Sequence, residues 1–120
     1  MNKEEVVALK KEVSDHLIGE LLPFWASRII DKINGGYITH FDKDGKDSGE
    51  DEKSLIAQTR SVYTLSSAHR AGYGEGKLAA LAKHGVDFLI DKMWDKEHGG
   101  FFWMMDREGN VKIDQKIIHP

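Results

Sequence analysis

The sequence predicts a mainly helical repeat protein in which helices alternate with short β-hairpins. The segment from Asp31 to Tyr37, Asp-Lys-Ile-Asn-Gly-Gly-Tyr, returns 64 positions later as Asp-Lys-Glu-His-Gly-Gly-Phe. The turn from Asp42 to Gly45 recurs at the same offset as Asp106 to Gly109. Apolar residues between these motifs follow helical spacing. Because repeated units usually bury their apolar faces by stacking on neighbours, two copies indicate a piece of a larger array.

The first predicted element runs from about Lys3 to Ile33, where apolar residues are spaced by three to five positions. It is one long helix or two, because Pro23 removes a backbone donor and is expected to cause a kink or a restart in the first turn of the second half. Gly35 and Gly36 then permit a sharp change of direction. The β-prone segment 37–41 and the following Asp44-Gly45 turn predict a short hairpin.

The second half of the chain repeats this plan. The polar segment 49–52 predicts a loop, and a helix is expected from Ser54 to Arg70. Three glycines between residues 72 and 76 break it before a further helix from Lys77 to Met93. Residues 101–105 and the Glu108-Gly109 turn predict the second hairpin. No linker interrupts the chain, so residues 1–120 are expected to belong to one partial domain without a second one.

Composition narrows the classes of partner and site. The formal net charge of the 120 residues is −3, and the basic residues are scattered, which disfavours nucleic acid as the main partner. No cysteine is present, so disulfides and thiolate metal sites are excluded. The six histidines form no metal-binding motif, and neither a metal nor a cofactor is expected. Because the start lacks the apolar run of a signal peptide and no stretch is long enough to span a membrane, the expected compartment is the cytoplasm.

The helix predicted at 54–70 carries the candidate functional residues. Helical spacing places four side chains on one mixed stripe, namely Ile56, Arg60, Tyr63 and Ser67. Three apolar side chains lie away from that stripe and are expected to pack on neighbouring helices: Leu55, Val62 and Leu65. Arg60 and Tyr63 therefore either line a cavity or, as is common for arginine, lie on a solvated surface.

The motifs from Gln58 to Ser66 and from Trp94 to Gly100, with the Gly35-Gly36 pair, resemble the N-acylglucosamine 2-epimerase family. This family includes cellobiose 2-epimerases and aldose–ketose isomerases, and the resemblance spans about residues 21–116. It implies an all-α (α/α)6 barrel, a toroid of six helical hairpins around a sugar-binding cleft. Six units of the observed repeat would need about 384 residues, so this chain corresponds to about the first third.

The resemblance implies a sugar 2-epimerase or aldose–ketose isomerase that moves a proton at C2 of a mono- or disaccharide through an enediolate. Arg60 matches the family's catalytic cation, whereas the histidines that act as acid and base in the family belong to later helices. Tyr63 and Ile56 are the expected substrate-binding neighbours. His119 is a further candidate that faces the cleft in a complete protein or is otherwise a terminal residue without fixed structure. The chain alone is not expected to catalyse.

The sequence departs from the family pattern at one point, and two other functions are alternatives. Relatives continue the second hairpin with a Lys and then a Gln-x-Phe segment, whereas this chain reaches Lys116 and stops at Pro120. Glycoside hydrolases and lyases also use this toroid, but a hydrolase needs paired carboxylates, and the acidic segment 50–52 lies in a predicted loop. A short helical interaction module is the second rival. The partial toroid predicts an exposed apolar flank, and the sequence leaves the oligomeric state open.

Overall fold

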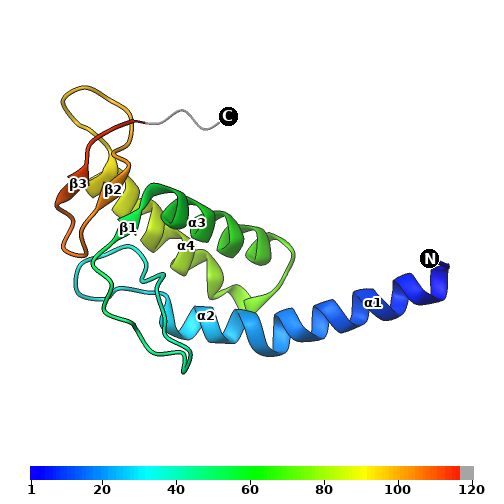
Figure 1. Cartoon of the computed structure of the whole chain (residues 1–120). Coiled ribbons are helices and arrows are strands. Elements are labelled where there is room, and N and C mark those ends of the chain that lie inside the picture. The colour runs from blue at the N-terminus through cyan, green and yellow to red at the C-terminus, as the bar shows by residue number, and fades with distance from the viewer. Residues whose placement is uncertain (117–120) are drawn as a thin grey trace.

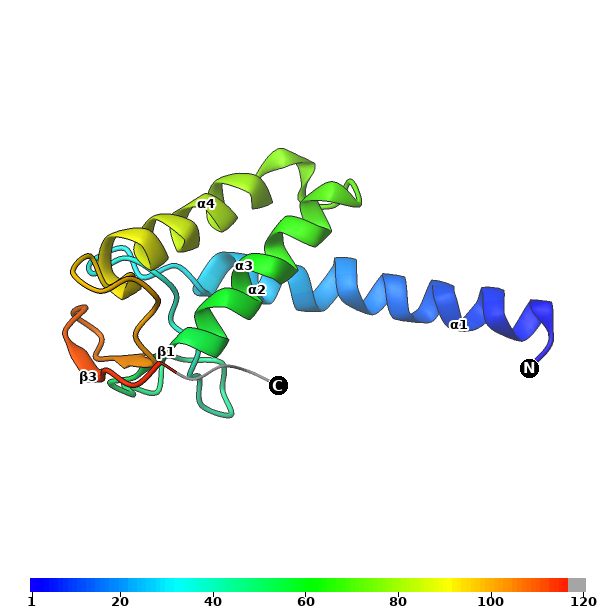
Figure 2. The same cartoon turned by 90° about the horizontal axis from the view of Figure 1, so that it is seen from above.

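The computed structural model describes residues 1–116 of the chain and measures 55 × 32 × 26 Å along its principal axes. Helix α1 (Lys3–His16), the π-helical turn η1 (Leu17–Leu21) and helix α2 (Leu22–Arg28) follow one another as one long rod. Its first half projects away from the body of the molecule (Figures 1 and 2). No residue of α1 is buried, so this helix is held in place mainly from its α2 end.

Local signals set the limits of this rod. The side chain of Asn2 caps α1 by accepting a 2.9 Å hydrogen bond from the backbone N–H of Glu5. Pro23 lies in the first turn of α2, as expected, and the π-helical turn before it lets the helix continue. The prediction that helix extends to Ile33 is wrong. The helix ends at Arg28 because Ile30 pairs with Tyr37 across a tight loop.

The two helices predicted in the second half are confirmed. Helix α3 (Leu55–Arg70) begins at Ser54, whose hydroxyl accepts a 3.1 Å hydrogen bond from the N–H of Ala57, and ends before Gly72 at φ +90°. The 3₁₀ turn η2 (Gly74–Gly76) joins it to helix α4 (Leu78–Phe88). The π-helical turn η3 (Leu89–Met93) then continues α4 to the residue where the prediction ended it.

The hairpins gather at one end of the helices (Figure 1). The second hairpin contains strands β2 (Met104–Met105) and β3 (Val111–Ile113), and β1 (Lys53–Ser54) pairs antiparallel with β2 to give the sheet order β1-β2-β3. The first hairpin forms its turn, but only single bridges pair its arms, such as Phe41 with Asp47. The expected β structure of residues 37–41 is therefore limited to bridges at its two ends, Tyr37 and Phe41, while the hairpin turn is confirmed.

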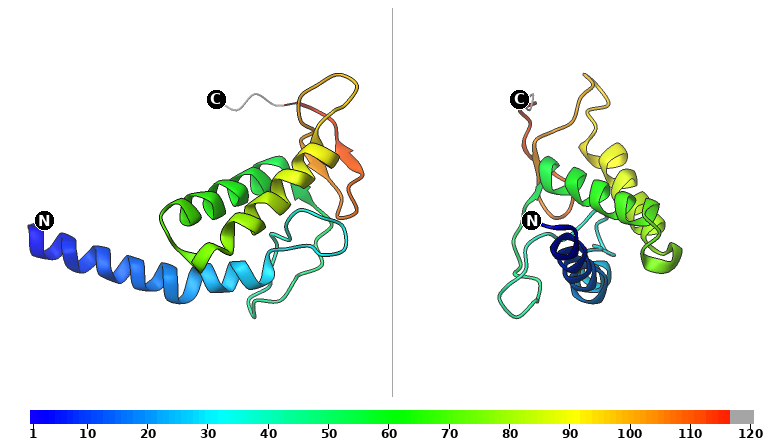
Figure 3. Two further views of the ribbon diagram at one scale, coloured as in Figure 1. Left: turned by 180° about the vertical axis from the view of Figure 1, so that it is seen from behind. Right: turned by 90° about the vertical axis from the view of Figure 1, so that its right-hand side faces the viewer.

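Helix α3 packs beside α4 (Figure 3) and contributes to both parts of the core. One cluster joins it to α2 and to the first part of α4, and consists of Leu22, Ile29, Tyr37, Leu65, Ala68, Leu78 and Ala82. The other joins it to the end of α4 and the second hairpin, and consists of Phe88, Leu89, Met93 and Met105. Leu55, Val62 and Leu65 pack into these clusters as predicted, and Phe101 and Phe102 fill the space beside the second.

Tyr37 connects the first loop to the far side of the core. Its ring is fully buried, and its hydroxyl donates a 2.7 Å hydrogen bond to the carbonyl oxygen of Leu81 in α4. The ring occupies the space beside Gly85, where a Cβ atom would collide with it. No helix within residues 1–116 has the length and apolar character needed to cross a bilayer.

Candidate functional site

The rotation of α3 about its own axis determines which of its side chains are buried and which are exposed. Gln58 is fully buried and forms two 2.9 Å hydrogen bonds with the backbone of Tyr37, one to its carbonyl oxygen and one from its N–H. This paired contact resembles a step of a β-ladder and fixes the rotation of the helix. Residues on the opposite side of α3 therefore point away from the loop that Tyr37 belongs to.

Arg60 and Tyr63 lie on that opposite side and are exposed, Tyr63 to 74%, whereas Ile56 is half-buried. Within residues 1–116, the guanidinium of Arg60 forms neither an ion pair nor a hydrogen bond with another side chain or carbonyl. Arg60 and Tyr63 thus share one exposed face of α3, and the Arg60 guanidinium has no ionic partner within the described residues. His119, the remaining candidate, lies outside the described residues.

A groove of about 380 Å³ runs between the η1–α2 segment and α3, and Arg60 is one of the residues that line it. Most of its lining is apolar, with hydroxyl groups on the α3 side; the residues are Leu17, Leu21, Leu22, Trp25, Ile29, Thr39, Ala57, Arg60, Ser61, Thr64 and Leu65. Neither Tyr63 nor Ile56 belongs to this lining. The structure therefore places the predicted residues on one helix face but brings only Arg60 to the groove.

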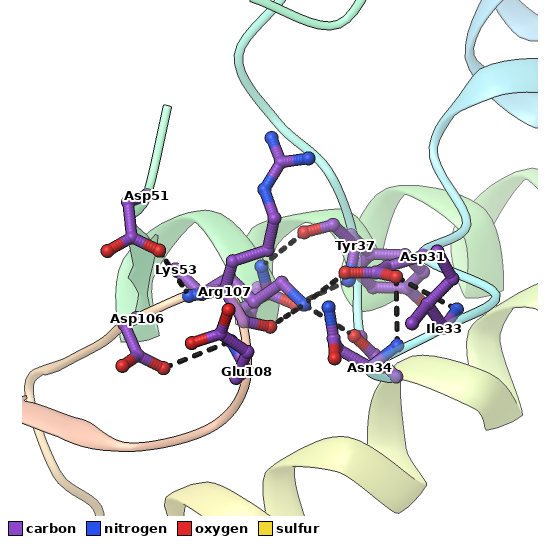
Figure 4. A network of polar contacts seen from close by, with 12 residues as sticks. Asp31, Ile33, Asn34, Tyr37, Asp51, Lys53, Asp106, Arg107 and Glu108 are labelled. Atoms are coloured by element: carbon purple, nitrogen blue, oxygen red, sulfur yellow. Dashed lines mark hydrogen bonds and ion pairs between the residues drawn. The ribbon is translucent and has the colours of Figure 1, made fainter. Parts of the chain in front are cut away.

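The Asp-x-x-x-Gly-Gly loops form a second polar centre. One carboxylate oxygen of Asp31 accepts hydrogen bonds from the N–H groups of Ile33 and Asn34, both at 3.0 Å, and thereby closes the loop. Its other oxygen lies 2.7 Å from the ammonium of Lys53, and this ion pair is buried (Figure 4). Asp95 closes the second loop in the same way and pairs with Lys116 at 2.6 Å.

These ion pairs shift the acid strength of both aspartates. Burial raises the pKa of Asp31, but the hydrogen bonds from Lys53 and from the Asn34 N–H outweigh it and leave this pKa below its ordinary value. The hydrogen bond from Lys116 and the backbone N–H of His98 lower the pKa of Asp95 to about 2. Both carboxylates are charged and engaged at neutral pH, so they are structural clamps and poor proton acceptors.

Sequence reasoning missed both lysines, because each follows its aspartate by 22 or 21 residues and lies outside any local motif. A signal was nevertheless present in the sequence: each lysine lies two residues after an aspartate, because Asp51-x-Lys53 recurs as Asp114-x-Lys116. Within the described part of the chain, no three His, Cys, Asp or Glu side chains gather in a way that would hold a metal ion.

The comparisons with known proteins agree with this architecture. The N-acylglucosamine 2-epimerase family model matches residues 36–118. A cellobiose 2-epimerase from Dictyoglomus turgidum is 33% identical over 115 residues, which is 96% of this chain. A mannose-6-phosphate isomerase from Rhizobium meliloti is 27% identical over 86% of the chain. The structure of cellobiose 2-epimerase from Bacillus thermoamylovorans superposes with a TM-score of 0.80 at 33% identity over 91% of the chain.

The chain spans less than a third of the length of these relatives: 29% of the Dictyoglomus enzyme and 28% of the solved Bacillus chain. The fold class expected from the sequence, a helical toroid of which this chain supplies only a part, is confirmed by this superposition.

Proposed function

We propose, because this chain belongs to the N-acylglucosamine 2-epimerase family, that it is part of a sugar 2-epimerase or aldose–ketose isomerase of the cytoplasm. Its substrate would be a mono- or disaccharide with a reducing end. The observation that carries the proposal is the position of Arg60, a cation without an ionic partner among residues 1–116, on the face of α3 opposite its anchored side. Four similar proteins are cellobiose 2-epimerases.

The reaction requires three groups. A base removes the proton from C2 of the open-chain aldose, and the electron pair of the broken C–H bond moves into the C1–C2 bond while negative charge collects on the C1 oxygen. A cation stabilises this enediolate, and an acid returns a proton. Return of a proton to the opposite face of C2 restores the C1 carbonyl and gives the epimer. Delivery to C1 instead, with the C2 hydroxyl proton passing to the C1 oxygen, leaves a carbonyl at C2 and gives the ketose.

Arg60 suits the role of the cation. A guanidinium remains charged throughout the pH range of proteins and offers a planar set of N–H donors to neighbouring oxygens. Gln58 anchors α3 only two residues away, so the Arg60 Cα has a fixed position even though its side chain is exposed. In this proposal Tyr63 and Ile56 contact the sugar, and the acid and base lie in the part of the toroid that this chain does not cover.

One observation favours a second function, the helical interaction module. The projecting helix α1 exposes several apolar side chains, namely Val6, Val7, Leu9 and Val13. Single exposed apolar residues are normal, but a row of them on an otherwise unburied helix is typical of a surface that another element covers. This function does not exclude the first, because a neighbouring unit of a toroid is itself such a covering element.

A chimera tests the proposed function. The segment of the Dictyoglomus turgidum cellobiose 2-epimerase that matches this chain is replaced by residues 1–116, and conversion of cellobiose to its C2 epimer is measured. We expect activity, and we expect Arg60→Ala to lower kcat by about 10²- to 10³-fold, the loss seen when one oxyanion-stabilising donor is removed. Arg70→Ala is the matched control, because Arg70 is an exposed arginine in the last turn of the same helix.

Two results would count against the proposal in different ways. A folded chimera with no turnover of cellobiose or of mannose would remove support for the sugar reaction. An active chimera in which Arg60→Ala behaves like Arg70→Ala would leave the reaction intact and exclude Arg60 as its cation. Residues 1–120 alone are expected to show no turnover in either case.

A further inference from the structure

A buried lysine joins the two repeat units. Lys53 is 2% exposed, and its ammonium donates to Asp31 Oδ2 at 2.7 Å and to the carbonyl oxygen of Gly35 at 2.7 Å, both in the first loop. It also donates to the carbonyl oxygen of Arg107 at 2.9 Å, in the turn of the second hairpin (Figure 4). The carboxylate of Asp51 accepts the N–H of the same Arg107 at 3.0 Å. Asp51 and Lys53 therefore bind both backbone groups of one turn residue.

The same acid and lysine occur again after the second hairpin as Asp114 and Lys116, but only half of the junction is present. Lys116 pairs with Asp95 at 2.6 Å, as Lys53 pairs with Asp31. Its side chain is 35% exposed, against 2% for Lys53. Within residues 1–116 the ammonium has Asp95 as its one hydrogen-bond acceptor, and Asp114 is exposed without a hydrogen-bond donor.

We infer that Asp114 and Lys116 form a docking site for the hairpin turn of a following repeat unit. The ammonium of Lys116 donates to the backbone carbonyl of the turn residue that corresponds to Arg107, and the carboxylate of Asp114 accepts that residue's N–H. Because both contacts are to the backbone, the site selects the shape of an Asp-x-x-Gly turn and tolerates different side chains in it. This inference rests on the internal repeat and is independent of the proposed sugar chemistry.

The completed junction also indicates why a following unit fits better than a second copy of this chain. Ser54 directly follows Lys53 and starts α3, which packs against the end of α4 through Leu55 and Val62. A following unit joined to Lys116 would likewise begin with a helix and then present its own hairpin turn. A second copy would offer the turn around Lys43, the counterpart of Arg107, but no helix joined to Lys116 as α3 is joined to Lys53.

An extended chain made from the protein's own sequence tests the site. Residues 1–116 are followed directly by residues 54–116, so that Lys116 precedes Ser54 as Lys53 does in the natural order. Lysine amines are labelled with a small acylating reagent, and mass spectrometry reads the rate at each residue. We expect the internal Lys116 to react about tenfold more slowly than in the 120-residue chain, because an amine held by three acceptors reacts only after local opening. The terminal copy of Lys116 should keep its fast rate and is the internal control.

Substitution provides the second readout. Lys116→Met at the internal copy should lower the unfolding temperature of the extended chain clearly more than it lowers that of the 120-residue chain, whereas replacement of the exposed Lys96 by methionine should change neither. Unchanged labelling of the internal Lys116, or an added unit without helical signal, would overturn the inference. Protection of Lys116 in the 120-residue chain that increases with protein concentration would overturn it in favour of a second copy as the occupant.

Discussion

Replacement of Lys53 by methionine tests whether the buried junction holds the two units together. Methionine retains most of the side-chain volume and its contact with the ring of Phe88, over which the ammonium lies at 5.0 Å. It removes the positive charge and three hydrogen bonds. The carboxylate of Asp31, whose side chain is 5% exposed, is then left buried without its counter-ion.

The magnitude follows from that burial. Breaking one partner of a buried ion pair costs about 3 to 5 kcal/mol. The lower end applies here, because Asp31 keeps its two N–H donors at 3.0 Å. A loss of about 3 kcal/mol lowers the folding equilibrium constant by about two orders of magnitude and the unfolding temperature of a chain of this size by about 10 °C.

Urea unfolding followed by circular dichroism measures the effect, with the slope checked for a constant change in exposed surface. Lys96→Met is the matched control, since Lys96 is an exposed lysine of the second loop and its replacement should cost less than about 0.5 kcal/mol. The double variant Asp31→Asn/Lys53→Met should recover part of the loss, because a neutral amide accepts the same loop N–H groups without a buried charge. A Lys53→Met protein within about 0.5 kcal/mol of the parent would refute the reasoning.

Three further predictions concern the loops and the helix cap. Lys116 holds the folded pKa of Asp95 at about 2, below the unfolded value of about 3.9. The stability that this ion pair contributes is therefore complete above about pH 5 and is lost as the pH falls toward 2. Equal free energies of unfolding at pH 6 and pH 3 would contradict this prediction. Gly36→Ala should destabilise by about 1 to 3 kcal/mol, because φ is +68° and a Cβ would meet the ring of Phe88 at 2.8 Å; a neutral effect on thermal unfolding would exclude that strain. Ser54→Ala should cost about 1 kcal/mol in urea unfolding by removing the cap of α3, whereas Ser54→Asp should retain it; equal losses would argue against capping.

The helices could be predicted because their limits are set by nearby residues. Ser54 accepts the N–H of Ala57 at the start of α3, and the glycine-rich segment ends it, so both signals lie within a few residues of the boundary. The signal from Pro23 was equally local, because this proline lies in the first turn of the helix whose start it predicts. The end of α2 was different, because it is decided by the pairing of Ile30 with Tyr37 across the loop, which no helical pattern records.

The hairpins show how context decides strand formation. Residues 37–41 and 101–105 have similar β propensity, yet only the second segment contains a strand. The difference is the partner, since Lys53 and Ser54 pair with Met105 and Met104. Strands of two or three residues gain their stability from such neighbours.

Part of the candidate site was likewise visible in the sequence and part was hidden. Helical spacing placed Arg60 and Tyr63 on one face of the helix, and the structure shows that both side chains are exposed there. The anchor of that face was missed, because glutamine is usually exposed and nothing near Gln58 indicates that its amide pairs with the backbone of Tyr37. The lysine junctions were missed because Asp114 and Lys116 follow Asp51 and Lys53 at an offset one residue shorter than the repeat.

A charged junction has a consequence that an apolar one would lack. Apolar side chains can shift slightly against one another and stay in contact. The ammonium of Lys53, by contrast, must keep hydrogen-bond distances of 2.7 to 2.9 Å to oxygens of Asp31, Gly35 and Arg107. These three acceptors belong to both units, so their geometry fixes the second hairpin relative to the first loop. Because Ser54 is the next residue and caps α3, the same geometry fixes where that helix begins and hence the height of Arg60 along it. We infer that the junction supports the candidate site at a distance: it would cost stability to desolvate the lysine, and in return the position of the cation is set by directed hydrogen bonds.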